Sequence, residues 1–183
     1  MEPDRTGVRP ADEPIPSHAL SFGRRLDLPR VIVWDALVDP VLVSGWLGEA
    51  DIDAAPGGRF DVRPGAPEHR RPVGVARGVV VSIVAPRQLE IESTGEAGAA
   101  PARVRFVLDD VPGGPRDRST EISVTITSPT PLVHPEEARA AWLTHLDLLH
   151  DLLHGRIADW DRWAADREPA WLAYRADSAR RDG

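Results

Sequence analysis

The feature that most constrains the fold is the regular alternation of apolar and polar residues through the middle of the chain. Ile122, Val124 and Ile126 alternate with Ser and Thr residues, and the same period of two recurs in earlier segments near residues 60, 90 and 106. A strand with this pattern buries one face and exposes the other. The pattern therefore predicts an antiparallel sheet with one face in a core.

The spacing changes after residue 134 to that of an amphipathic helix. Each large apolar side chain buried by such a helix contributes roughly 1.5–3 kcal/mol, which is enough to hold a long helix against a sheet. Two short helices are also predicted after the first strand, because Pro29 and Pro40 can each begin a helix and Gly48 can end the second. The apolar stripe of the long helix consists of Trp142, Leu146, Leu149 and Leu153.

The chain divides into three parts by composition. Residues 1–17 are rich in Pro and charge and predict a disordered N-terminal arm, whereas residues 18–155 carry the sheet and the long helix. Residues 156–183 form a Trp-rich extension, in which Trp160 and Trp163 continue at helical spacing and Pro169 precedes a further short helix. This extension is expected to fold back on the domain, with a homodimer contact as the alternative.

Charge and composition remove several classes of function. A formal net charge of −7 argues against a general nucleic-acid binder and against docking on anionic membranes. The chain has no Cys, no apolar run long enough to span a bilayer and no hydrophobic signal core, so we expect a cytoplasmic protein. No phosphate-binding glycine loop or nucleophile motif is present, and we expect no cofactor.

Several short motifs occur in a fixed order along residues 18–155, and together they carry a resemblance. The chain resembles the START-like (SRPBCC) superfamily and, within it, the bacterial homologues of the activator of heat-shock protein 90 ATPase. The motifs are Val33-Trp34-Asp35-Ala36-Leu37, Asp39-Pro40 with Trp46, Pro56-Gly57-Gly58-Arg59-Phe60, Val84-Ala85-Pro86-Arg87-Gln88-Leu89, and Trp142 with His145-Leu146-Asp147.

The resemblance implies an α+β helix-grip fold. In this fold a curved antiparallel sheet of about seven strands wraps a long C-terminal helix, and two short helices follow the first strand. Relatives include lipid carriers, aromatic polyketide cyclases, hormone receptors and stress-response co-chaperone domains, so the fold does not determine the function. The extra N-terminal domain of the eukaryotic co-chaperone has no counterpart here, which argues against chaperone activation. A co-chaperone-like protein-interaction domain, with a chaperone partner, stays open as an alternative function.

The resemblance also implies an apolar cavity between sheet and long helix. A small hydrophobic molecule, such as a lipid or an aromatic metabolite, is the expected ligand. The alternative is that the inward-facing residues simply pack together as a core. The predicted ligand-binding residues are Trp46, Phe60, Val62, Phe106, Ile122, Val124, Trp142, His145 and Leu149.

His145 is the polar member of this set and leaves two functions open. It can bind a polar group of a ligand, or it can act as a general acid–base in a cyclase-like or aromatase-like enzyme. Satisfaction by a nearby backbone group is the structural alternative. His150 and His154 have metal-ligand spacing, but they share a polar helix face with acidic residues, so no metal site is expected.

Overall fold

One antiparallel sheet of seven strands organises the part of the chain that the computed structural model describes, residues 18–94, 101–114 and 118–181. The strand order is β1-β7-β6-β5-β4-β3-β2, and all neighbours run antiparallel. The predicted arm 1–17 lies outside the described residues. The strands are β1 (His18–Leu26), β2 (Gly48–Ile52), β3 (Arg59–Pro64), β4 (Arg77–Val84), β5 (Gln88–Ser93), β6 (Arg103–Pro112) and β7 (Arg118–Ser128).

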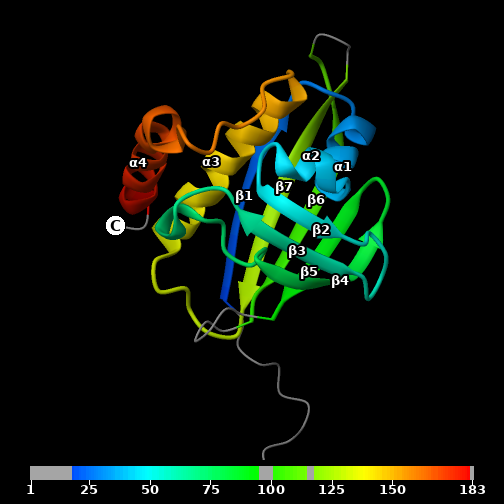
Figure 1. Cartoon of the computed structure of the whole chain (residues 1–183), viewed down its shortest axis with the longest axis horizontal. Coiled ribbons are helices and arrows are strands. Elements are labelled where there is room, and N and C mark those ends of the chain that lie inside the picture. The colour runs from blue at the N-terminus through cyan, green and yellow to red at the C-terminus, as the bar shows by residue number, and fades with distance from the viewer. Residues whose placement is uncertain (1–17, 95–100, 115–117, 182–183) are drawn as a thin grey trace, which may run out of the picture.

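The sheet curves around one long helix, as Figure 1 shows. The short helices follow β1 directly, as the sequence predicts, and the last helix lies along the outer side of the long one. The α+β helix-grip architecture predicted from the sequence is confirmed. The helices are α1 (Arg30–Val38), α2 (Pro40–Ser44), the 3-10 turn η1 (Glu68–Arg70), α3 (Pro135–Leu153) and α4 (Trp163–Arg181).

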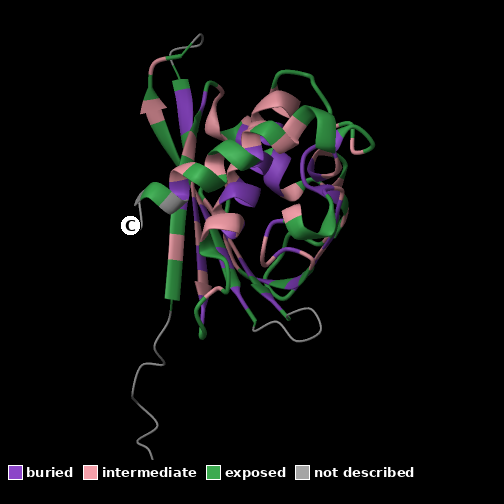
Figure 2. Cartoon of the chain, turned by 90° about the vertical axis from the view of Figure 1, so that its left-hand side faces the viewer, coloured by how far each residue is buried: buried purple, intermediate pink, exposed green. Residues whose placement is uncertain are grey.

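The register of the strands aligns apolar side chains into a row beneath α3. Phe22 of β1 pairs with Val124 of β7, which pairs with Phe106 of β6, which pairs with Leu89 of β5. All four residues are buried, and Trp142 of α3 lies on the row. Figure 2 shows buried residues concentrated between the helices and the sheet. The period-two alternation thus produces the core, because the strand register places the apolar residues of neighbouring strands opposite each other on the same face of the sheet.

The boundary between α2 and β2 differs from the prediction. Helix α2 ends at Ser44, and Gly48 is the first residue of β2 rather than the end of the helix. Gly48 has a φ of 141°, and a Cβ there would lie 2.2 Å from the carbonyl oxygen of Arg63. This glycine is therefore needed for the close approach of β2 to β3.

The C-terminal extension differs from the prediction in two details. The segment between α3 and α4 is not helical, because Gly155 adopts a φ of 80° and ends the helical path just after α3. Residues 155–162, named here the linker, therefore place Trp160 outside any helix. The second helix is longer than expected, since α4 continues through Pro169 to Arg181.

Helix α4 packs back on α3 within the same chain. Trp163 and Trp171 of α4 are almost completely buried. Tyr174 donates a 2.7 Å hydrogen bond to Asp147 of α3, and Arg167 pairs with Asp151 of α3 at 2.6 Å. The acidic side of α3, predicted as a solvated face, is thus partly covered by α4. Folding back in the monomer is the arrangement that the structure shows. No helix among the described residues is long and apolar enough to cross a membrane.

We expect the substitution Arg70→Ala to loosen α4. The guanidinium carbon of Arg70 lies 3.5 Å from the centre of the Trp171 ring, and its Nη2 donates to Glu168 at 2.6 Å. Loss of both contacts should cost about 1–2 kcal/mol and raise amide hydrogen exchange across residues 163–181. Arg162→Ala is the matched control, because Arg162 forms only an exposed pair with Asp166. Equal exchange in the two variants would contradict this role of Arg70.

Candidate functional site

The nine predicted ligand-binding residues come together in one interior. They are contributed by the turn after α2, by strands β3, β6 and β7, and by α3, and none is more than 2% exposed. Ile122, Val124 and Trp142 have no accessible surface, so in this conformation no water-sized void borders them. The residues pack as a core, which is the alternative that the sequence left open. Entry of a ligand therefore requires a side chain to move.

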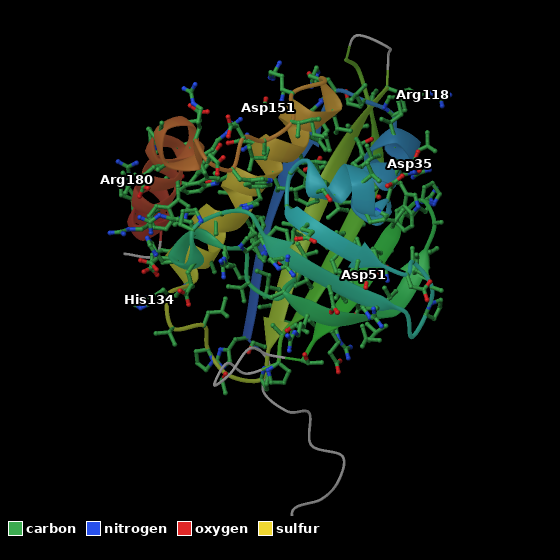
Figure 3. All side chains as sticks on the ribbon, in the orientation of Figure 1. Asp35, Asp51, Arg118, His134, Asp151 and Arg180 are labelled. Carbon is green, nitrogen blue, oxygen red and sulfur yellow. The ribbon has the colours of Figure 1, made fainter. Side chains whose placement is uncertain are left out.

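Two open grooves of the described residues lie on the other side of the sheet. One, of about 590 Å³, is lined by charged residues of β2, β3 and β4 that include Asp51, and Figure 3 shows Asp51 on this outer strand. Another, of about 620 Å³, lies over β5, β6 and β7. Arg59 pairs with Asp51, and Arg103 pairs with Glu92, so exposed ion pairs cover the face of the sheet on which these grooves lie. Of the nine predicted residues, Val62 alone lines either of these two grooves.

His145 has one ring nitrogen bonded and the other unbonded. Its Nδ1 lies 2.8 Å from the carbonyl oxygen of Ala141, one helical turn earlier. A carbonyl only accepts, so Nδ1 carries the proton and Nε2 has a free lone pair. Burial lowers the pKa of His145 to about 4, against the smaller opposite effect of the Ala141 carbonyl. The imidazole is therefore neutral at pH 7, with Nε2 as an acceptor.

The Nε2 atom of His145 is buried and has no hydrogen-bond partner among the described residues. The other buried nitrogens without a partner in that part of the chain belong to Arg24, Arg30, Trp163 and Trp171, and all of them are N–H donors. A buried polar atom left unpaired costs about 1–3 kcal/mol. Among these unpaired side-chain nitrogens, the Nε2 of His145 is the acceptor, so His145 is a candidate ligand-binding group.

The remaining polar atoms of the site are already used inside the protein. Trp46 donates its indole N–H to the carbonyl of Ala36 at 2.9 Å, and Trp142 donates to that of Val73 at 3.2 Å. Thr144, buried beside His145, donates to the carbonyl of Ala140 at 2.8 Å. Among the nine predicted residues, His145 is thus the one with a polar side-chain atom to offer. Sites of acid–base catalysis bring several such groups together.

Trp160 of the linker contacts His145 and was not predicted as part of the site. The two rings are stacked, with centroids 6.3 Å apart and planes 25° apart. The indole also lies against Gly65 at the end of β3, where a Cβ would come within 2.1 Å of the ring. Trp160 is only partly buried, unlike the core around it. The tryptophan content of the extension was visible in the sequence, but no spacing connects residue 160 to residue 65.

The histidines at the end of α3 lie against each other with their rings tilted by 31°. The rings of His150 and His154 are 4.3 Å apart, and Nδ1 of His154 lies 2.8 Å from the carbonyl oxygen of His150. Asp151, which Figure 3 labels on α3, accepts hydrogen bonds from Arg156 and Arg167. Within the described ranges, no three potential metal ligands gather at one point.

Comparison with known proteins places this geometry in a family. The family model described as Activator of Hsp90 ATPase homolog 1-like protein matches residues 27–154. A search of the curated proteins finds no match. The matched range runs from the end of β1 to the end of α3 and includes all nine predicted site residues. It does not include Trp160 or α4.

Three solved structures with the same fold are 19–24% identical in sequence to this chain. CalU16 from Micromonospora echinospora is 23% identical with a TM-score of 0.62, over 87% of this chain and 89% of CalU16. The BPP1335 product of Bordetella parapertussis is 24% identical with a TM-score of 0.59, over 85% and 84% of the two chains. DynU16, from the dynemicin biosynthetic locus, is 19% identical with a TM-score of 0.60, over 76% of this chain and 48% of DynU16. The chain belongs to the Activator of Hsp90 ATPase homolog 1-like family, within the START-like superfamily.

Proposed function

We propose that this protein binds a small hydrophobic molecule carrying a hydrogen-bond donor, between the sheet and α3. The observation that supports the proposal is the unpaired, buried Nε2 of His145. His145 belongs to an interior whose apolar residues come from β3, β6, β7 and α3, among other elements. A ligand hydroxyl or amine would donate to Nε2, while its apolar body replaces contacts of the core.

The state of His145 favours binding over catalysis. With a pKa near 4, the imidazole has no proton on Nε2 to give at pH 7, so it is a poor general acid, and it is also a weak base. No carboxylate accepts from its Nδ1, which bonds the Ala141 carbonyl instead. A cyclase-like activity, the alternative considered from the sequence, would need further polar groups in the interior. DynU16 is described as a putative protein in the dynemicin biosynthetic locus, which is consistent with either ligand binding or a cyclase-like activity here.

Two probes that differ only in the donor test this proposal. 1-Naphthol carries a hydroxyl, and 1-methoxynaphthalene has the same ring system without the donor. A hydrogen bond to Nε2 worth about 1 kcal/mol should make naphthol bind about 5-fold more tightly in calorimetric titrations. His145→Leu should remove that preference, whereas His150→Leu, at the exposed end of the same helix, should keep it. Equal binding of the two probes by the unmodified protein would contradict the proposal.

We also expect His145→Leu to stabilise the unliganded protein. The substitution removes an unpaired buried acceptor and introduces an apolar side chain of similar volume into an apolar site. The free energy of unfolding at pH 7 should rise by about 1 kcal/mol, measured by urea denaturation. A variant that is more stable and binds naphthol less tightly would identify His145 as a residue kept for binding. Loss of stability would instead indicate that Nε2 has a partner in solution.

A further inference from the structure

We propose that Trp160 occupies the place of the ligand, and that this place accepts a flat aromatic ring. This place, named here the slot, is bordered by the His145 ring, which lies nearly parallel to the indole, and by Gly65, which lies against the fused bond of the indole. The indole of Trp160 would leave the slot when a hydroxylated aromatic molecule enters. This inference rests on the proposed function, since it names the class of ligand and the group that competes with it.

The glycine at position 65 is explained by the ring and not by the backbone. Gly65 does not have the positive φ that favours glycine. A Cβ built there would lie 2.1 Å from Cδ2 of Trp160 and 2.5 Å from Cε2 and Cε3, which no real side chain tolerates. The missing side chain therefore leaves room for the fused edge of a bicyclic aromatic ring. The other neighbour of the indole, the imidazole of His145, is also planar and lies 25° from parallel to it.

Trp160 fills the shape of the slot but does not satisfy its chemistry. The plane of the indole is nearly parallel to that of the imidazole, yet Nε2 of His145 has no hydrogen-bond partner in the described part of the chain. The 6.3 Å between centroids means that the indole is displaced sideways from the imidazole rather than centred over it. A ring in this place would bring a hydroxyl substituent to the imidazole edge. Such a ligand gains the stacking of the indole and also the hydrogen bond that the indole leaves unmade.

The position of Trp160 in the linker allows it to move without loss of α4. The linker is not helical, and Ile157 within it is 73% exposed. The linker is fixed before Trp160 by the bond from Ala158 N–H to the carbonyl of Gly45, at 3.0 Å. It is fixed after Trp160 by Trp163, which is 1% exposed. Between these two points, a rotation of the Trp160 side chain exposes the slot while the core and α4 stay in place.

Removal of the indole should raise the affinity for a flat ring. Trp160→Ala is expected to bind 1-naphthol about 10-fold more tightly than the unmodified protein, because no group competes for the slot. 1-Decanol, a flexible alcohol of similar carbon number, should change less than about 2-fold. Ile157→Ala, in the same linker, is the control and should change neither affinity. Trp160→Leu, which keeps apolar volume, gives the same test if the alanine variant does not fold.

Gly65→Ala, added to Trp160→Ala, shows where the probe binds. The new Cβ occupies the slot, so the gain for naphthol should disappear while the decanol affinity stays unchanged. A gain that survives Gly65→Ala, or that is equal for decanol, would overturn the aromatic slot. If naphthol and decanol bind the unmodified protein and Trp160→Ala equally, the competition by Trp160 is wrong and the proposed function stands. If neither probe binds any variant, the proposed function itself fails.

Discussion

The substitution Trp142→Ala is expected to lower the free energy of unfolding by about 3–5 kcal/mol, as full truncation of a buried aromatic residue does. Trp142 has no exposed surface. Its ring lies edge-on to Phe106 at 5.6 Å and tilted against Phe22 at 6.2 Å. Its indole N–H also donates to the carbonyl of Val73, which the substitution leaves without that bond. The Trp142 side chain thus connects α3 with β1, with β6 and with the segment before β4.

Urea denaturation followed by far-UV circular dichroism measures this effect. Val133→Ala, at an 86% exposed position just before α3, is the control and should change stability by less than about 0.5 kcal/mol. A double-mutant cycle with Phe106→Leu should give a coupling of about 0.5–1.5 kcal/mol, the range for an aromatic pair. A loss below about 1 kcal/mol for Trp142→Ala would mean that α3 is not held by this contact, and the helix-grip packing would need revision.

The fold could be predicted because its main signals are local and consistent. Alternation in the strands and the apolar stripe from Trp142 to Leu153 indicate which faces are buried. The resemblance to a known family implies how the sheet and the long helix pack together. The contacts of α4 could not be predicted in the same way. They depend on pairs such as Arg70 with Trp171 and Tyr174 with Asp147, whose members are far apart in the sequence. A polar residue on a helix looks solvated until the covering element is known.

The nine residues predicted from the sequence lie together in one interior, but the contact of Trp160 with His145 was not predicted. His145 could be selected because it lies three residues after Trp142, on the flank of an apolar stripe. The unpaired state of its Nε2 could not be predicted, since it depends on the hydrogen bond between Nδ1 and the Ala141 carbonyl. Trp160 was assigned to a continuing helix because its spacing fits one, but the backbone at Gly155 ends the helical path. The meeting of Trp160 with Gly65 is a tertiary contact that no periodicity encodes.

The second large effect is a loss of stability on acidification that comes from His145. In the folded protein its pKa is lowered to about 4 by burial, whereas in the unfolded chain it returns to about 6.5. Between these two values the unfolded state binds more protons than the folded state, so stability falls as the pH decreases from about 6.5 to about 4. The difference between the two pKa values amounts to about 3 kcal/mol over the whole interval.

His145→Leu separates this effect from other titrations, since Leu binds no proton. Partial burial alone would raise the pKa of Asp151, but hydrogen bonds from Arg156 and Arg167 outweigh it and hold that pKa below its usual value. The stability that Asp151 contributes is therefore lost only at pH values near and below about 4, in both proteins. Subtracting the two pH profiles of unfolding free energy, measured from pH 7.5 to 4, should leave a slope confined to the interval below about 6.5. Parallel profiles would show that His145 accepts a proton as readily when folded as when unfolded. Nε2 of His145 would then be hydrated in the folded protein, and the buried, unpaired acceptor on which the proposed ligand recognition depends would not exist.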